Sequence, residues 1–392
     1  MIYATPALND ADQDVVELIT KQRDKLRSYT QSNPRRWLGS LRRTTFARAI
    51  QGSNSIEGYH ATIDDALAAI DDEPALDERT ETWFAIRGYR NAMTYIMQAA
   101  QDPFFELGKQ FLKSLHFMMI SYDMTKLPGQ WRPGPIFVVN STSGETVYAA
   151  PESDLVDPLI QELVASMNDR SDVAPMVRAA MAHLNLTMIH PFKDGNGRMA
   201  RSLQTLILSR DGLLHPVFCS IEEWLGRNTQ DYYDILASTG QGVWNPGRDA
   251  LPWVRFCLKA HYQQAATLIR RNEEYEKLFL GIQRIIERES LHERTAIPIF
   301  DAALGIRLTN SRYRSETDVT DFTAARDLKR LCEVNLLEPK GEKRTRTYSA
   351  AKELQTLRAS VRINLPITDP YDLVIRRKKA AQAIHEPRIP GL

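Results

Sequence analysis

The sequence predicts a mainly α-helical protein that carries one β-hairpin and a small C-terminal domain. Apolar residues recur at helical spacing through most of the 392-residue chain, and such a period is the primary sign of amphipathic helices. A stretch rich in proline and glycine, residues 127–135, interrupts the helices and is followed by two short β-prone runs. Near Ile297 the pattern changes to a short helix and a basic, strand-like run. A chain of this length can bury a core in each of two or three domains.

The composition excludes several classes of protein. Apolar residues make up 43% and charged residues 25% of the chain, as in ordinary globular proteins, and no apolar run reaches the ~18 residues that a membrane-spanning helix needs. Lys and Arg number 50 against 49 Asp and Glu, so contact with nucleic acid would need a local basic patch. The cysteines, at positions 219, 257 and 332, are far apart, and the N-terminus has no apolar leader. We therefore expect a cytoplasmic protein without a zinc site or membrane contact.

The predicted helices lie on both sides of the interruption. Apolar periodicity predicts helices over residues 14–26, 54–71, 78–100, 106–120, 154–168, 174–188, 199–209, 230–236 and 252–288. The prolines and glycines of residues 127–135 exclude a helix between the fourth and the fifth of these. The runs 136–139 and 146–149 flank the polar turn 140–145. Two β-prone runs around such a turn predict a hairpin.

The C-terminal pattern predicts a winged helix. Residues 323–331 form a helical pattern with an N-cap candidate, and a turn at 340–342 leads into the basic run 343–348. Residues 302–350 hold ten Lys and Arg against seven Asp and Glu, an excess too small to identify the partner. DNA and a protein partner fit equally well. The DNA contacts would come from Lys343, Arg344 and Arg346 on the wing and from Thr323, Arg326 and Arg330 on the helix.

The segment from His190 to Arg201, HPFKDGNGRMAR, carries the residues suited to catalysis. It lies between two predicted helices, and Pro191 ends the first of them, so we expect a loop that runs into a helix N-terminus. Gly195 and Gly197 allow the backbone to approach a ligand closely and to direct N–H groups at it. A helix N-terminus behind such a loop is a site for anions.

The polar side chains of this segment complete a phosphate site. Arg198 and Arg201 are three residues apart, so both can reach one set of phosphate oxygens. Asp194 offers the hard oxygen that Mg²⁺ takes beside phosphates. His190, with an ordinary pKa of about 6.5, suits a general base at neutral pH. The plainer interpretation is a helix-capping loop, but capping needs neither a base, a metal ligand nor two arginines.

The segment resembles the Fic family motif, HPFx[D/E]GNGRxxR, at every defined position, and similar elements extend over residues 80–260. The resemblance implies a helical Fic core and a protein adenylyltransferase, which moves AMP from ATP to a Ser, Thr or Tyr hydroxyl of a target protein, or of itself, and releases pyrophosphate. Doc-like kinases of this family have lysine where Gly197 stands, so Gly197 favours AMP transfer. The resemblance implies His190 as the base, Asp194 as the Mg²⁺ ligand, Gly195, Asn196 and Gly197 at the anion hole, and Arg198 and Arg201 at the outer phosphates.

A second motif lies upstream. Residues 53–58, SNSIEG, resemble the Fic inhibitory pattern [S/T]xxxE[G/N]. Ser53 and Glu57 are four residues apart and would share one helix face. By the resemblance, Glu57 would pair with Arg201, occupy its guanidinium and repel the γ-phosphate. The alternative is a solvated helix residue.

Two further parts of the chain correspond to Fic elements. The hairpin at 135–149 corresponds to the Fic flap, whose open strand edge can pair with an extended segment of the target protein; the alternative is a hairpin that only covers the core. Asn228, Tyr232 and Tyr233 resemble the residues that line the adenine pocket. For either tyrosine a core position is the alternative.

These observations divide the chain into five parts. We expect an N-terminal helical region at 1–105 with the inhibitory helix, a Fic core at 106–262, a linker helix at 263–298, a winged helix at 299–362 and a tail at 363–392. Prolines and the basic run Arg376–Lys379 predict a loosely ordered tail. Alternative functions are a nucleotide-sensing DNA-binding regulator, an enzyme that uses another nucleotide donor, and one that removes AMP. A homodimer is one assembly that the resemblance implies.

Overall fold

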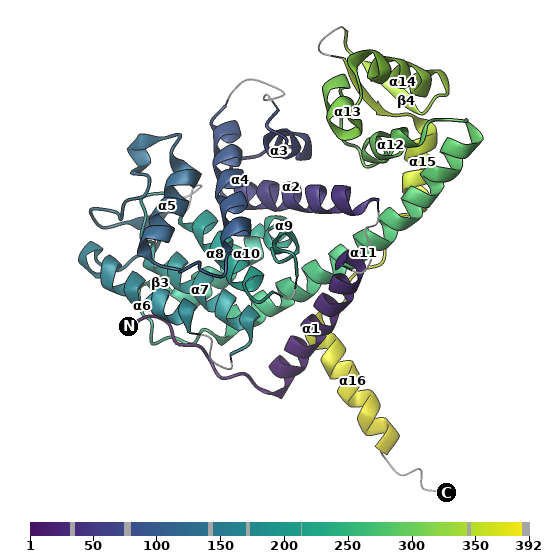
Figure 1. The fold of residues 1–392 in the computed structure, drawn as a ribbon. Helices are drawn as coiled ribbons and strands as arrows, with labels where there is room; N and C mark the ends of the chain where they lie inside the picture. The colour runs from purple at the N-terminus through teal and green to yellow at the C-terminus, as the bar shows by residue number, and fades with distance from the viewer. Residues whose placement is uncertain are drawn as a thin grey trace, which may run out of the picture. The chain divides into compact units, whose positions relative to one another are not determined.

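The computed structural model describes residues 1–31, 36–73, 80–139, 144–169, 173–212, 214–342 and 346–385. The predicted mainly α-helical fold is confirmed (Figure 1). The chain forms two compact units, which are described separately: residues 1–27, 45–266 and 367–392 form the first, and residues 28–44 and 267–366 form the second. Three helices contribute residues to both units, namely α1 (Asp10–Gln31), α2 (Leu38–Ile56) and α11 (Leu251–Arg288).

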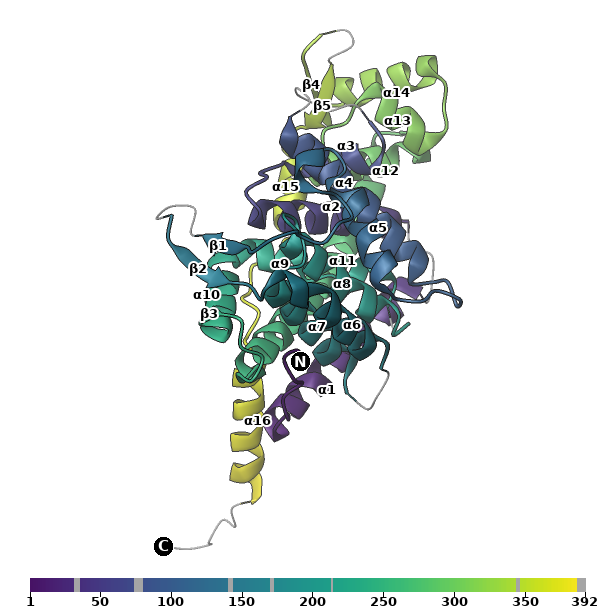
Figure 2. The ribbon, with the colours of Figure 1, turned by 90° about the vertical axis from the view of Figure 1, so that its left-hand side faces the viewer.

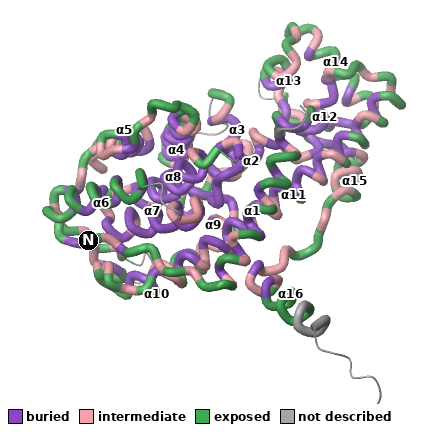
Figure 3. Tube along the Cα trace, turned by 60° about the horizontal axis from the view of Figure 1, so that its bottom comes forward, coloured by how far each residue is buried: buried purple, intermediate pink, exposed green. Residues whose placement is uncertain are grey.

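Two buried helices form the centre of the first unit. They are α7 (Pro175–Ile189) and α8 (Asn196–Ser209), which pack against each other and are buried along almost their whole length (Figure 3). The helices around them are α3 (Ile63–Ile70), α4 (Glu81–Ala99), α5 (Lys109–Ile120), α6 (Val156–Asn168), α9 (Glu222–Arg227) and α10 (Thr229–Gly240). The first turns of α8 carry two buried arginines, which apolar packing alone does not explain.

One predicted helix is wrong in its extent. The pattern over 54–71 contains a break, because α2 ends at Ile56 and α3 begins at Ile63. Gly58 adopts a φ of +82°, which ends the helix, and Thr62 caps α3 in a capping box with Asp65. Glu57 therefore lies in the turn after α2 and not on a helix face with Ser53. The other predicted helices are present, with their ends shifted by a few residues.

The predicted hairpin is confirmed, although residues 140–143 of its turn lie outside the described residues. Strands β1 (Phe137–Val139) and β2 (Thr146–Ala149) pair antiparallel, and β2 also pairs in parallel with β3 (Gly242–Val243), which the sequence did not predict. The sheet lies beside α10 (Figure 2). Tyr148 anchors β2, because its ring is buried and its hydroxyl donates to the Met188 carbonyl at 2.8 Å. Strand β1 is an edge strand of this sheet.

The second unit contains a helical cluster and a strand pair. Its elements are α12 (Ala296–Ala303), α13 (Asn310–Thr317), α14 (Asp321–Glu333), β4 (Leu337–Lys340), β5 (Thr347–Ala350) and α15 (Lys352–Ser360). The predicted helix at 323–331 lies within α14, whose N-cap Thr320 accepts from the Thr323 amide, and β4 and β5 pair antiparallel. Arg326 and Arg330 are exposed on α14. Lys343 and Arg344 lie outside the described residues, and the winged helix remains a prediction.

The prediction of a loosely ordered tail is wrong for residues 370–385, which form α16 (Pro370–His385). Proline suits the first position of a helix, because its fixed φ is helical and no helical carbonyl is available for its nitrogen. Two contacts tie α16 to α1: the Tyr371 hydroxyl donates to Asp12 at 3.1 Å, and Lys378 pairs with Asp14 at 2.8 Å. Within the part of the chain that the structure describes, no helix combines the length and apolarity needed to cross a bilayer.

A close backbone approach between α2 and α9 positions the segment that contains Ser53. A Cβ added to Gly226 would lie 2.7 Å from the Gly52 Cα, and one added to Gly52 would overlap the Glu222 carbonyl. Both contacts involve backbone atoms, so a side chain at either glycine would push the two helices apart.

We therefore expect Gly52→Ala to lower the free energy of unfolding by about 1–3 kcal/mol, the usual cost of overpacking. The matched control is Gly39→Ala on the same helix, since an added Cβ there meets nothing within 4 Å. Gly39→Ala should raise the free energy by about 0.5–1 kcal/mol through backbone entropy. Urea denaturation followed by circular dichroism measures both changes, and equal stabilities for the two variants would contradict the close approach.

Candidate active site

The candidate site lies in the loop between α7 and α8. Helix α7 ends at Ile189, His190 adopts a left-handed φ of +53°, and Gly195 (φ +79°) is the N-cap of α8. The Asn196 side chain closes the loop, since its Oδ1 accepts from the Phe192 amide at 2.9 Å and its Nδ2 donates to the Phe192 carbonyl at 2.8 Å. Its backbone N–H lies in the first turn of α8, where no helical carbonyl precedes it. The predicted loop running into a helix N-terminus is thus present.

His190 has the environment of a neutral base. Its Nδ1 lies 3.2 Å from the Thr187 carbonyl, which can only accept, so Nδ1 carries the proton and Nε2 is the acceptor. Burial lowers the pKa of His190 below its ordinary value, and the charge of Arg132 lowers it further, while the Thr187 carbonyl opposes the shift. The imidazole is therefore neutral at pH 7.

Asp194 is an ionised carboxylate. Its Oδ1 accepts from the Gly195 amide at 2.5 Å, and its Oδ2 lies 3.0 Å from the Lys126 ammonium. Burial raises the pKa of Asp194, but the charges of Arg198 and Lys126 more than offset this, and the pKa lies below its ordinary value. No group of three or more His, Cys, Asp or Glu within the described ranges could hold a metal ion. A single carboxylate does fit Mg²⁺ that is shared with phosphate oxygens, because Mg²⁺ binds through one or two carboxylates plus substrate phosphates.

Arg198 and Arg201 are buried with exposures of 0% and 1%. Among the described residues, none of the three guanidinium nitrogens of Arg198 has a hydrogen-bond partner. Its guanidinium lies 5.1 Å from the centre of the Tyr59 ring, and its Nη2 lies 3.8 Å from the Asp194 carboxylate. A buried charge without hydrogen bonds is costly. The unsatisfied guanidinium therefore marks a place for an anion.

The structure brings Arg201 together with both residues of the upstream motif. Its Nε donates to the Ser53 hydroxyl at 2.8 Å, and its Nη2 donates to the Ser53 carbonyl at 3.0 Å and to Glu57 Oε1 at 2.6 Å. Gly197 makes room for this pair, because a Cβ there would overlap Glu57 Oε1 and lie 3.0 Å from Arg201 Nη1. The carboxylate of Glu57 thus occupies one edge of the guanidinium.

The three residues predicted for an adenine pocket have different surroundings. Tyr232 is buried and its hydroxyl lies 3.0 Å from His183 Nε2, which gives this tyrosine the core position that was the alternative. Tyr233 is 45% exposed and its hydroxyl donates to the Ile56 carbonyl at 2.6 Å. Asn228 donates to the Trp224 carbonyl at 2.7 Å. Adenine contact remains a prediction for all three residues.

Sequence reasoning missed Arg132. This arginine is 4% exposed and donates to the carbonyls of His190 at 2.8 Å, Gly134 at 2.6 Å and Pro151 at 2.5 Å. It therefore joins the residues before and after the hairpin to the loop of His190. The only sequence signal was a charged residue within a run of turn-forming residues, and that signal does not tell where the side chain points.

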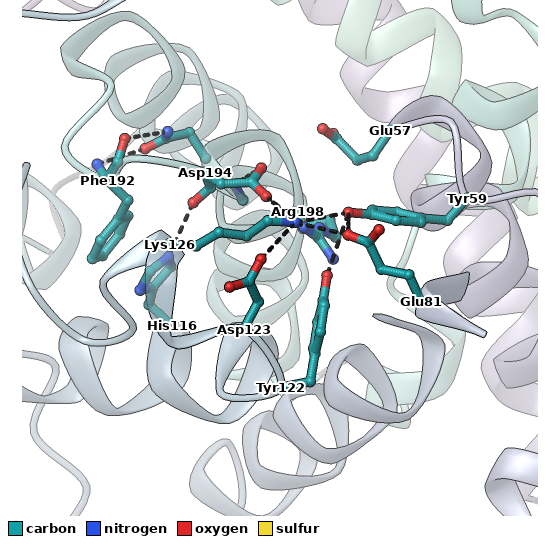
Figure 4. A network of polar contacts seen from close by, with 12 residues as sticks. Glu57, Tyr59, Glu81, His116, Tyr122, Asp123, Lys126, Phe192, Asp194 and Arg198 are labelled. Carbon is teal, nitrogen blue, oxygen red and sulfur yellow. Dashed lines mark hydrogen bonds and ion pairs between the residues drawn. The ribbon is translucent and has the colours of Figure 1, made fainter. Parts of the chain in front are cut away.

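His116 and Lys126 were also missed. His116 accepts from the Gly129 amide at Nδ1 and donates from Nε2 to the Asp194 carbonyl at 3.0 Å, while its ring stacks on Phe192 at 3.8 Å. Burial lowers the pKa of His116 to about 4, so it stays neutral in this position. The contacts of Lys126 with Asp194 and Tyr59 are drawn in Figure 4. Both residues hold Asp194 in place, one at its backbone and the other at its carboxylate.

Comparison with known proteins identifies the domain around this site. Residues 106–208 match the Fic/DOC family. Residues 106–208 are therefore similar to a Fic/DOC domain. A curated relative, protein adenylyltransferase Fic of Nematostella vectensis, is 25% identical over 305 residues, which cover 74% of this chain and 63% of the relative. Protein adenylyltransferase fic-1 of Caenorhabditis elegans is 37% identical over 102 residues, which cover 26% of this chain and 18% of the relative. The chain thus spans less than two thirds of these relatives.

Solved structures show the same fold. A Fic family protein from Desulfovibrio desulfuricans G20 aligns with a TM-score of 0.58 and 21% identity, covering 89% of this chain and 98% of that protein. The Fic-1 structure from C. elegans aligns with a TM-score of 0.53 and 21% identity over 66% of this chain and 71% of that one. The helical Fic core and its loop between α7 and α8 therefore belong to a known fold.

The environment of His190 predicts its protonation. Its resonances in an NMR titration should move with a midpoint below the ordinary value of about 6.5, because burial disfavours the imidazolium, and the histidine is neutral above that midpoint. Replacement of His190 by Gln identifies the signal, and the urea-unfolded chain gives the reference midpoint. A folded-state midpoint above that of the unfolded chain would contradict the assigned environment.

Proposed function

We propose that the protein is an adenylyltransferase that moves AMP from ATP to a hydroxyl of a target protein and that Glu57 restrains this activity. The observation that carries the proposal is a neutral His190 on a loop that leads into an anion site with the unsatisfied guanidinium of Arg198. The curated relatives named protein adenylyltransferase support the same reaction. ATP and a protein hydroxyl are then the two substrates.

In the proposed reaction His190 is the general base. Its Nε2 accepts the proton of the target hydroxyl, the hydroxyl oxygen forms a bond to the α-phosphorus, and the bond from that phosphorus to the β-phosphate bridging oxygen breaks. The electron pair and the negative charge leave with pyrophosphate. The Thr187 carbonyl and Arg132 hold the ring in the required tautomer and place. This is catalysis by positioning and general-base chemistry.

The remaining residues of the loop bind the phosphates. Arg198 supplies unpaired donors, and the N–H groups at the start of α8 add the positive end of a helix dipole. Asp194 would hold Mg²⁺, which neutralises phosphate charge when bound. Arg201 can donate two parallel hydrogen bonds to phosphate oxygens only when Glu57 no longer accepts from its Nη2.

Strand β1 is the proposed docking edge for the target protein. Phe137 and Val139 expose 56% and 55% of their surface on this edge strand. An extended segment of a target can pair with such an edge through backbone hydrogen bonds and cover the apolar side chains. Arg132 links the residues that flank the hairpin to the His190 carbonyl. A docked segment would therefore lie at a fixed distance from the base.

The restraint by Glu57 predicts an activated variant. Glu57→Gly should raise AMP incorporation at least about ten-fold, equivalent to about 1.4 kcal/mol, because Arg201 then has an open edge for phosphate oxygens. Mass spectrometry of the protein after incubation with ATP and Mg²⁺ measures the added AMP. Parallel incubations with GTP and UTP identify the donor.

The matched control for this experiment is the double variant Glu57→Gly, His190→Ala, which should add no AMP. Labelling of the double variant at the level of Glu57→Gly would show that His190 is not the base. No labelling of Glu57→Gly with any of the three nucleotides would favour the nucleotide-sensing regulator over the transferase.

A further inference from the structure

Lys126 places a half-buried cation against the candidate metal ligand. It ends the short helix η1 (Met124–Lys126), and its side chain is 19% exposed. Its ammonium lies 3.0 Å from Asp194 Oδ2, 3.0 Å from Glu81 Oε1 and 3.1 Å from the Tyr59 hydroxyl (Figure 4). An ammonium has three protons, so these three contacts use all of its donors, and the Asp123 carboxylate lies farther away, at 3.8 Å.

With the contact to Lys126, each carboxylate oxygen of Asp194 has a partner within the protein. The Gly195 amide already donates to Oδ1 at 2.5 Å, and Lys126 holds Oδ2. Mg²⁺ binds carboxylate oxygens at about 2.1 Å, which would place it within a few ångström of the ammonium if both used Oδ2. Two cations at that separation repel each other strongly. The ammonium must therefore move away when a divalent cation takes this oxygen.

The surroundings of Lys126 give the ammonium another position. Glu81 is 59% exposed, and it accepts from the Tyr59 hydroxyl as well as from Lys126. Lysine has a flexible four-carbon stem and donors that rotate freely. The ammonium can thus release Asp194 and keep the carboxylate of Glu81 and the hydroxyl of Tyr59 as partners.

The Tyr59 contact extends this arrangement to the inhibitory turn. Tyr59 follows Glu57 by two residues, and its amide donates to the Asn54 carbonyl at 3.0 Å. Its ring faces the guanidinium of Arg198 at 5.1 Å. Lys126 is therefore in contact with the candidate metal ligand on one side and with the turn of Glu57 on the other.

We propose that Lys126 is a resident counter-cation of Asp194, which holds the carboxylate in the nucleotide-free protein and, when a divalent cation binds with the nucleotide, releases it while it keeps Glu81 as a partner. Lys126 is then a positioning residue that sets the divalent-cation concentration needed for nucleotide binding. The proposal rests on the proposed role of Asp194 as the metal ligand.

The test measures binding, with the full chain and a fluorescent ATP analogue titrated with Mg²⁺ and followed by anisotropy. Lys126→Met keeps the apolar stem and removes the charge, so it should lower the half-saturating Mg²⁺ concentration about five-fold or more, within the range of coupling between two ligands. Affinity for the analogue in EDTA should stay unchanged, because Lys126 is not a phosphate ligand in this arrangement.

Two further variants make the result specific. Lys193→Met removes an equal charge from the loop that carries Asp194, but this ammonium donates to the Thr125 carbonyl at 3.0 Å, so the Mg²⁺ requirement should not change. Glu81→Gln removes the nearer of the two other carboxylates beside Lys126, leaving Asp123 at 3.8 Å, and should raise the Mg²⁺ requirement. Glu81 is exposed, so this variant tests the proposal even where Lys126→Met does not fold.

The outcomes separate this proposal from the one on which it rests. An unchanged Mg²⁺ requirement in Lys126→Met, or equal weakening of binding with and without Mg²⁺, would overturn the counter-cation role, as would a Glu81→Gln variant that needs no more Mg²⁺. Asp194→Asn should abolish the Mg²⁺ dependence. If it does not, the metal role of Asp194 fails; if it does while Lys126→Met has no effect, only the role of Lys126 fails.

Discussion

Two arginines that the fold buries at the start of α8 determine how the rest of the site is built. Removal of a guanidinium from water is unfavourable unless charges and hydrogen bonds replace the lost hydration. Arg201 obtains both from Ser53 and Glu57, at distances of 2.6–3.0 Å. Arg198 lacks hydrogen bonds from the described residues and faces a tyrosine ring. The turn after α2 is therefore part of the packing of α8, while the guanidinium of Arg198 has the Asp194 carboxylate at 3.8 Å as its ion-pair partner.

Side chains hold the loop before these arginines mainly by hydrogen bonds to its backbone groups. Arg132 and His116 bind the carbonyls of His190 and Asp194, and Asn196 closes the loop through both backbone groups of Phe192. None of these contacts uses the atoms that the proposed reaction needs, namely His190 Nε2 and the Asp194 carboxylate. Contacts of this kind fix the geometry of a site before the substrate arrives, which is the condition for catalysis by positioning.

The sequence predicted the parts of this protein that depend on local patterns. Apolar periodicity predicted most of the long helices, although not residues 38–53 of α2, and the motif from His190 to Arg201 predicted a loop at a helix start. The break at Gly58 was missed, because one glycine in an otherwise helical pattern carries little weight until its left-handed φ is known. Arg132, His116 and Lys126 were missed for a different reason. Their partners in the loop, His190 and Asp194, are 58 to 78 residues away in the chain, and only the fold brings them together.

The site contains its own substitutes for the charges that the proposed substrate would bring. Glu57 gives Arg201 the negative charge that a phosphate would supply, and Lys126 gives Asp194 the positive charge that a divalent cation would supply. These substitutes allow the buried charges to stay in place without a ligand. The free energy of nucleotide binding is then the difference between the ion pairs made with the nucleotide and cation and those made within the protein. A well-ordered site therefore need not bind nucleotide tightly. A change that removes one substitute shifts this difference toward the ligand, which is how a restraint can be strong without any movement of α8.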